Sequence, residues 1–211
     1  MDIRDQFRVP VPVAEAWTVL LDVERIAPCM PGAQLQEIEG DEFRGIVKVK
    51  VGPITAQYKG VASILEADEA AHRLVLKAEG RDTRGQGNAS ANVTVVLSPD
   101  GEGTLVEIET DLTVSGKVAQ FGRGVMADVS AKLLAQFAEC LQSKVAAGEL
   151  GGAAVTAPVA GTPGGARTIE APEVEAVDLM KAAGGAVMKR LVPTVVVAAV
   201  VVGLAVWLVS R

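Results

Sequence analysis

Five successive segments between residues 43 and 114 alternate apolar and polar side chains, and this pattern limits the fold more than any other feature. In residues 43–51, for example, Val47 and Val49 share one face, whereas Lys48 and Lys50 share the other. The alternation repeats in the segments 54–64, 73–81, 88–97 and 104–114, and turn-forming residues separate these segments. The sequence therefore predicts one antiparallel sheet with one dry and one solvated face.

The dry face of such a sheet needs a second layer. Residues 118 to 146 supply it, because their apolar residues recur at the spacing of one helical stripe. Residues 1–9 indicate a first strand, and residues 13–26 have helical spacing that ends at a proline-containing loop. The predicted fold class is α+β, with a curved antiparallel sheet around a long C-terminal helix and short helices after the first strand.

Small residues are frequent on the predicted dry face of the sheet. Small side chains on facing layers leave volume for an apolar ligand, unless the layers approach each other closely. The pattern leaves both interpretations open. The residues concerned are Gly45, Ala56, Gly60, Ala62, Ala78, Gly80, Ala89 and Ala91.

Composition and motifs exclude several classes of function. A net charge of -6 and 3% aromatic residues argue against a nucleic-acid partner. No nucleophile, phosphate-binding or metal-ligand motif occurs, so we expect no catalytic residue and no metal site. The single histidine, His72, lies in a predicted turn, where we expect it to be exposed. The N-terminus lacks the apolar core of a signal peptide. The two cysteines, Cys29 and Cys140, are therefore expected to be free thiols in a reducing compartment.

The C-terminal residues 191–209 form an uninterrupted apolar run. At 1.5 Å per residue, a helix of this length spans about 28 Å, which is close to the thickness of the bilayer hydrocarbon. Lys189 and Arg190 precede the run and fit a cytoplasmic flank. The sequence therefore predicts a single-pass C-terminal anchor that holds the domain at the cytoplasmic face of the membrane. A buried helix or an oligomer contact is the alternative.

Between the predicted domain, residues 1–146, and the anchor lie two further segments. Residues 147–175 are rich in Gly, Ala, Pro and Thr and indicate a flexible linker. Residues 176–190 combine a weak apolar stripe with basic residues, which indicates a possible amphipathic segment at the membrane surface. A frayed extension of the anchor is the alternative for this second segment.

Four sequence blocks resemble the G-type accessory protein of carbon monoxide dehydrogenase, the CoxG family of the START-like, or helix-grip, SRPBCC superfamily. These are MPGA at 30–33, the segment 48–68, RGQGNASANVTVVL at 84–97, and the segment 115–137. The resemblance implies a non-catalytic membrane adaptor for an aerobic molybdenum-containing CO dehydrogenase or a related hydroxylase. It also implies a cavity for an isoprenoid quinone, menaquinone or ubiquinone, and a role in passing electrons towards the respiratory chain. Recruitment without a ligand and a polyketide cyclase-like enzyme are the alternatives.

The inward faces of the predicted strands and helix give the candidate site residues. Tyr58 carries an aromatic hydroxyl that could donate to a quinone carbonyl, or it is a core tyrosine bonded to backbone. Trp17 is expected to pack the first helix on the sheet. The predicted cavity lining comprises Phe43, Val47, Val49, Tyr58, Val93, Val95, Ile108, Phe121, Val125 and Val129. The predicted mouth comprises Pro28, Met30, Pro31, Lys117, Gly122 and Arg123, and its basic residues face lipid phosphates, an acidic partner or solvent.

Overall fold

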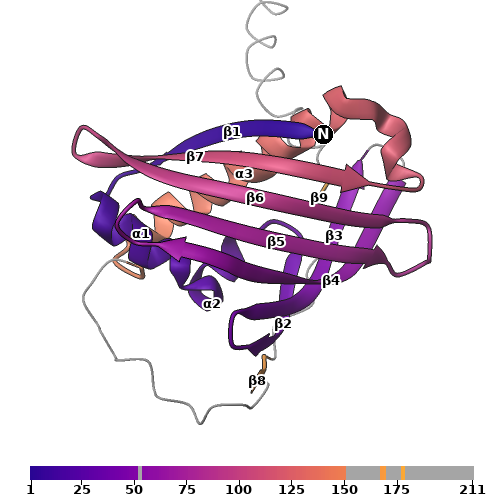
Figure 1. Ribbon diagram of the computed structural model, residues 1–211, viewed down its shortest axis with the longest axis horizontal. Helices are drawn as coiled ribbons and strands as arrows, with labels where there is room; N and C mark the ends of the chain where they lie inside the picture. The colour runs from indigo at the N-terminus through magenta and orange to yellow at the C-terminus, as the bar shows by residue number, and fades with distance from the viewer. Residues whose placement is uncertain (52–53, 151–166, 170–176, 179–211) are drawn as a thin grey trace, which may run out of the picture. The chain divides into compact units, whose positions relative to one another are not determined.

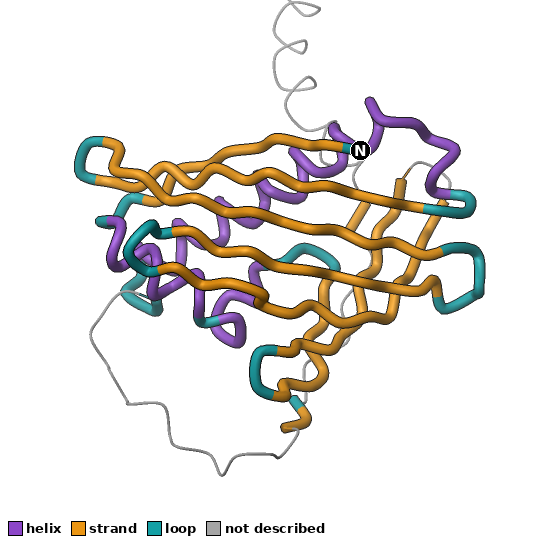
Figure 2. Tube along the Cα trace, viewed as in Figure 1, coloured by secondary structure: helices purple, strands orange, loops and turns teal. Residues whose placement is uncertain are grey.

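A computed structural model describes residues 1–51, 54–150, 167–169 and 177–178. Seven main strands form one antiparallel sheet whose neighbours follow the order β1-β7-β6-β5-β4-β3-β2 (Figures 1 and 2). The six segments after the first helices are therefore a meander, and β7 closes it against β1. The strands are β1 (Asp2–Val9), β2 (Ala33–Glu39), β3 (Glu42–Val51), β4 (Ile54–Asp68), β5 (Arg73–Asp82), β6 (Asn88–Asp100) and β7 (Gly103–Val114).

The helices occupy the two places that the sequence predicts. Three short ones connect β1 to β2, namely α1 (Val13–Leu21), α2 (Val23–Ile26) and η1 (Ala27–Cys29). After β7, a 3₁₀ turn, η2 (Val118–Phe121), leads into the long helix α3 (Gly122–Ala146). Gly122 separates the last two because its φ of 76° lies in the left-handed region, which favours glycine. The predicted α+β fold is confirmed, with this break at the start of its long helix.

The register of the sheet confirms the predicted alternation. Val95, for example, lies opposite Leu74 on one side and Ile108 on the other, and all three share the inward face. The same face carries Val106, which is fully buried, whereas its neighbour Glu107 is exposed. The sheet therefore has one solvated face and one face turned towards the helices.

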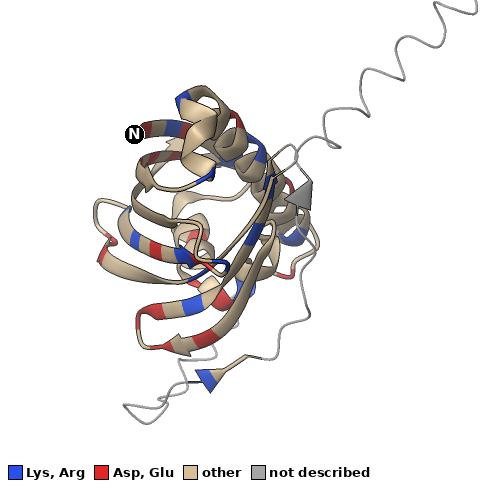
Figure 3. Ribbon diagram, turned by 90° about the vertical axis from the view of Figure 1, so that its right-hand side faces the viewer, with Lys and Arg blue, Asp and Glu red and all other residues tan. Residues whose placement is uncertain are grey.

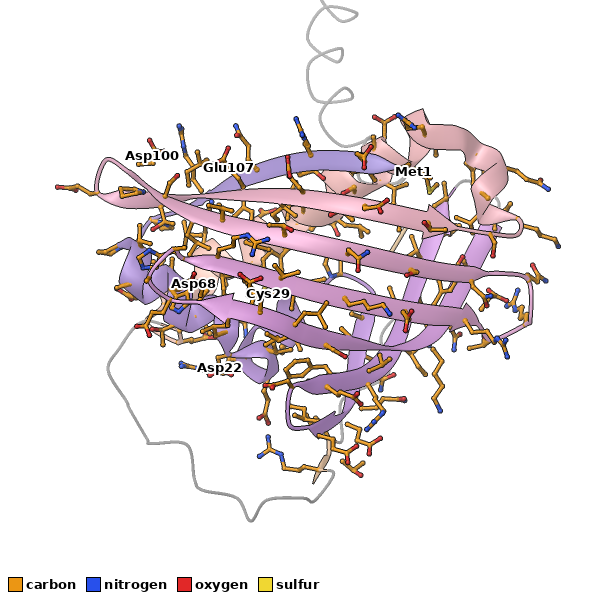
Figure 4. The ribbon with its side chains drawn as sticks, in the orientation of Figure 1. Met1, Asp22, Cys29, Asp68, Asp100 and Glu107 are labelled. Carbon is orange, nitrogen blue, oxygen red and sulfur yellow. A yellow bond between two sulfur atoms is a disulfide. The ribbon has the colours of Figure 1, made fainter. Side chains whose placement is uncertain are left out.

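The hydrophobic core lies at one end of this inward face. Trp17 of α1 is buried there, as predicted, together with Leu97 of β6. On α3, Phe137 meets the ring of Phe7 edge to face, with 5.7 Å between ring centroids. The β4–β5 and β6–β7 turns lie at the same end, where Figure 4 labels Asp68 and Asp100. We call this the core end, and the opposite end, with the β5–β6 turn, the β5–β6 end.

The chain beyond α3 differs from the predicted flexible linker at two places. Leu150 is buried in the core. Farther along, the strand β8 (Arg167–Thr168) pairs antiparallel with β2, and the Ile169 N–H donates to the Gln36 carbonyl at 2.7 Å. A further short strand, β9 (Val177–Asp178), falls within the predicted amphipathic segment.

The other C-terminal predictions cannot be compared with the structure. The predicted anchor, residues 191–209, and the rest of the predicted amphipathic segment lie outside the described residues. None of the helices within the described residues is long and apolar enough to cross a membrane.

Candidate functional site

The inward face changes character towards the β5–β6 end. On α3, Phe137 and Leu141 of the second half are buried, whereas Val125 and Val129 of the first half stay partly exposed, although all four belong to the predicted apolar stripe. On β3, Val47 faces inward with 39% of its surface exposed. Apolar side chains on the inward layer are thus left partly uncovered at this end, which makes it the candidate ligand-binding region.

Glycines cross three strands of the sheet in a single row. Gly45, Gly60 and Gly80 are direct partners in the antiparallel register. A Cβ on Gly60 would overlap the carbonyl oxygen of Glu79, and one on Gly45 would overlap that of Gln34. The sequence left open whether the small residues serve ligand volume or close approach. At these two glycines the reason is close approach, although it occurs between neighbouring strands and not between sheet and helix.

The predicted lining residues divide between the two ends. Val93 and Ile108 are partly buried and pack against the core, and Val95 belongs to it. On the β3–β4 pair, Val47 lies directly opposite Tyr58. Partly exposed residues at the β5–β6 end and on β3 form the remaining set, namely Phe43, Val47, Val49, Tyr58, Phe121, Val125 and Val129.

Tyr58 has a polar neighbour that the sequence analysis missed. Asp82 is its direct partner on β5 and is 7% exposed. Burial, followed by the negative charge of Asp82, raises the pKa of the Tyr58 hydroxyl above its usual value. The phenol therefore stays protonated and able to donate a hydrogen bond. The alternation of β5 could have indicated Asp82, because it continues the inward series after Gly80.

The carboxylate of Asp82 is already occupied by its own turn. Its Oδ1 accepts the backbone N–H of Arg84 at 2.9 Å and that of Gln86 at 3.1 Å. The bond from Gln86 is the main reason why the pKa of Asp82 is lower than usual. Asp82 therefore fixes the β5–β6 turn beside Tyr58 and does not act as a proton acceptor.

A second inward carboxylate lies on β1. Asp5 shares the inward face with Phe7, and its Oδ2 accepts a hydrogen bond from the Ser130 hydroxyl of α3 at 2.6 Å. This contact ties the middle of α3 to β1. The sequence analysis did not select Asp5, although it lies on the face of β1 that also carries Ile3 and Phe7.

The predicted mouth residues fall into two separate groups. Pro28, Met30 and Pro31 lie in or just after η1, where the Gly32 carbonyl accepts the N–H of Lys48 at 2.7 Å. This contact places exposed Met30 close to exposed Val47 in the fold. Lys117, Gly122 and Arg123 lie at the other end of α3. The helix runs 18 residues from Gly122 to Cys140, which is about 27 Å.

The structure contradicts the prediction of two free thiols. Cys29 of η1 and Cys140 of α3 form a disulfide, with 5.4 Å between their Cα atoms. The pair could not be inferred from the sequence, because 111 residues separate the two cysteines and only the packing of η1 on α3 brings them together. The disulfide fixes the loop that carries Met30 to the second half of α3.

The expected exposure of His72 is also wrong. Its ring lies edge-on to the buried Trp17, with 5.8 Å between ring centroids, and the side chain is half-buried. Across residues 1–51, 54–150, 167–169 and 177–178, no group of three or more His, Cys, Asp or Glu side chains is placed to hold a metal ion. His72 therefore contributes to packing at the core end.

A family model and solved structures match this chain. The model of the CoxG family, the G-type accessory protein of carbon monoxide dehydrogenase, matches residues 6–146. A conserved protein from Geobacillus kaustophilus has a TM-score of 0.63 and 21% identity, covering 70% of this chain and 97% of that one. No curated protein sequence matches significantly.

Two further structures share the fold at lower similarity. Ara h 8.0201 has a TM-score of 0.51 and 17% identity, with 70% and 98% of the two chains covered. The Zhui aromatase/cyclase from Streptomyces sp. R1128 has a TM-score of 0.50 and 13% identity, with 71% and 95% covered. At such identities these likenesses show the helix-grip fold alone.

Proposed function

The chain belongs to the CoxG family of carbon monoxide dehydrogenase accessory proteins, and from this we propose that it is a non-catalytic, quinone-binding membrane adaptor of an aerobic molybdenum CO dehydrogenase or a related hydroxylase. The anchor at residues 191–209 would hold the domain at the cytoplasmic face of the membrane. The inward apolar face at the β5–β6 end would hold the isoprenoid chain of menaquinone or ubiquinone. The protein would thereby bring enzyme and quinone together, so that electrons reach the respiratory chain.

One observation carries this proposal. Inward-facing apolar side chains of β3 and of the first half of α3 are partly exposed, beside a core end in which the same face is buried. Exposed apolar area costs about 25 cal/mol per Å², so such a face is stabilised by an apolar ligand. Tyr58 lies on this face with a protonated hydroxyl, which suits a quinone carbonyl as acceptor.

The anchor and the apolar face support each other energetically. Each CH₂ group of an isoprenoid chain that crosses water costs about 0.8 kcal/mol. A protein that takes up such a lipid must therefore contact the bilayer while it does so. A membrane anchor would keep the domain within reach of the bilayer and raise its effective concentration there.

A cyclase-like enzyme is less well supported by the inward polar groups. Asp5 is hydrogen-bonded to Ser130, and Asp82 accepts two backbone N–H groups. Carboxylates held in this way have little capacity left for general acid or base chemistry. The family match also favours an accessory role.

The test is to purify the full chain from its native host and to extract the bound lipids for mass spectrometry. We expect about one quinone per chain, as for a single-site ligand. The variant Val47→Asp should lose the quinone, because it places a charge on the apolar face. Val96→Asp, on the outward face of β6, is the control. A protein that carries no quinone and refuses added quinone would refute the carrier role and leave membrane recruitment as the function.

A further inference from the structure

Five basic residues at the β5–β6 end have no ion-pair partner within the described part of the chain. Lys59, Arg81, Arg84, Lys117 and Arg123 are all exposed, and none lies within 4.0 Å of a described carboxylate oxygen. The charge of Asp82 acts on Arg84, but the Asp82 side chain is buried. The local excess of positive charge contrasts with the net charge of -6 for the whole chain.

The fold gathers these five residues from separate elements. Lys59 and Arg81 are direct partners across β4 and β5 on the outward face. Arg84 follows in the β5–β6 turn. That turn packs against the end of β7, because the Ser115 N–H donates to the Asn88 carbonyl at 2.8 Å. This contact brings Lys117, two residues beyond Ser115, next to the turn, and Arg123 follows at the start of α3. We call these five residues the basic end.

Cations elsewhere in the domain are treated differently. Arg4 pairs with Glu109 at 2.8 Å, and Lys77 pairs with Glu79 at 2.9 Å. Further ion pairs join Arg8 to Asp100, Arg25 to Asp22, Arg44 to Glu39, Arg73 to Glu66 and Lys144 to Glu149. Like charges directly opposite each other on a sheet are destabilising, so the Lys59–Arg81 neighbours cost stability unless a negative surface covers them. Figure 3 views the domain from this side.

We propose that the basic end docks the domain onto the anionic surface of the lipid bilayer. The proposal rests on the proposed function, because the predicted anchor is what keeps the domain at a membrane. The five cations are long, exposed side chains from several elements, which suits a diffuse layer of lipid headgroups better than a single acidic side chain. Half-buried Phe121 lies between Lys117 and Arg123. Docking therefore turns the partly exposed apolar face towards the lipid that it would exchange.

The test measures how far lipid protects Lys117 from an amine-reactive label. The full chain is placed in vesicles of phosphatidylcholine alone, or of phosphatidylcholine with phosphatidylglycerol, and labelling is read by mass spectrometry. We expect labelling of Lys117 to fall at least about tenfold in the anionic vesicles, since each basic residue near such a surface contributes about 1 kcal/mol. The protection should disappear in about 1 M salt, where the Debye length is about 3 Å. Lys144, near the other end of α3, should show no such change.

Matched variants separate the basic end from net charge. Lys59→Gln, Arg81→Gln and Arg84→Gln together should remove the protection of Lys117. Arg4→Gln, Arg8→Gln and Arg73→Gln together remove the same charge from ion-paired sites of the outward face and should leave it intact. Circular dichroism checks that both variants fold.

Each result distinguishes this proposal from the proposed function. Co-flotation of the chain with both vesicle types reports the anchor, so failure to float refutes the anchor itself. A chain that floats while Lys117 reacts equally in both vesicle types refutes docking by the basic end and leaves the anchor intact. If the molybdenum enzyme alone then protects Lys117, the basic end is a protein-docking surface and the bilayer proposal is wrong.

Discussion

The two ends of this domain are built from the same strands and the same long helix, yet they are finished differently. At the core end, α1 and the second half of α3 cover the sheet, a disulfide joins η1 to α3, and Leu141 is 1% exposed. At the β5–β6 end, inward apolar residues such as Val125 stay partly exposed, and five cations lack ion-pair partners among the described residues. The comparison shows that an alternating strand defines an inward face, but the covering layer decides whether that face becomes core or binding surface.

The largest expected effect concerns the disulfide of the core end. Replacing both Cys29 and Cys140 by Ala releases a closure between residues 111 apart in sequence. Chain-entropy arguments predict a loss of about 3–5 kcal/mol in the free energy of unfolding. Urea unfolding with and without a thiol reductant measures it, and the reductant should not affect the double variant. Two free thiols titrating in the oxidised native protein would contradict the pairing.

A matched pair of truncations tests the difference in packing directly. Leu141→Ala at the core end should lower the free energy of unfolding by about 2–5 kcal/mol, because it opens a cavity in a filled core. Val47→Ala should cost less than about 1 kcal/mol, because Val47 is already 39% exposed. Equal losses in chemical denaturation would show that the two ends are packed alike.

A pair of glycine substitutions tests the close approach of the strands. Gly60→Ala should destabilise the fold by about 1–3 kcal/mol, since its Cβ would overlap the Glu79 carbonyl oxygen. Gly124→Ala in α3 meets no neighbouring atom and should stabilise by about 0.5–1 kcal/mol through helix propensity. Thermal unfolding of both variants gives the signs. A stable Gly60→Ala protein would argue that these glycines serve ligand volume after all.

The β5–β6 turn should depend on pH through Asp82. The pKa of its carboxyl is lower in the folded chain than in the unfolded chain, mainly because the Gln86 N–H binds the carboxylate. The stabilisation is therefore present above the unfolded value of about 4 and is lost as pH falls through the lower folded value. The advantage of the wild type over Asp82→Asn in urea unfolding should shrink between about pH 5 and pH 2. Asp41→Asn, in the β2–β3 turn, controls for the loss of one charge.

The smallest expected effect concerns the segment that pairs with β2. Arg167 forms an ion pair with Glu24 of α2, beside the hydrogen bond from the Ile169 N–H. Exposed pairs contribute about 0–1 kcal/mol. Arg167→Glu and Glu24→Arg should therefore each raise hydrogen exchange at Ile169 a few-fold, and the exchanged pair should restore it. If the double variant exchanges as fast as the single ones, the ion pair does not hold this segment on β2.

Much of the fold follows from local pattern. The strands from Phe43 to Val114 were predicted because period-two alternation directly reports a face, and α3 because its stripe continues for about seven turns. The inward position of Asp82 was within reach of the same reasoning, since it follows Gly80 in the series. The contacts of Asp5 with Ser130 and of Arg167 with Glu24 were not, because 125 and 143 residues separate the partners.

The sequence by itself determined which residues face inward, where the chain turns, and that the domain precedes an apolar C-terminal run. These features depend on the order of neighbouring residues, so they can be read along the chain. Only the tertiary structure decided that Cys29 meets Cys140, that Gly60 answers to the backbone of β5, and that five cations gather at one end without partners in the described part of the chain. The reason is physical: sheet register and the line along which α3 crosses the sheet bring together residues far apart in sequence, and local propensity contains no term for such distances.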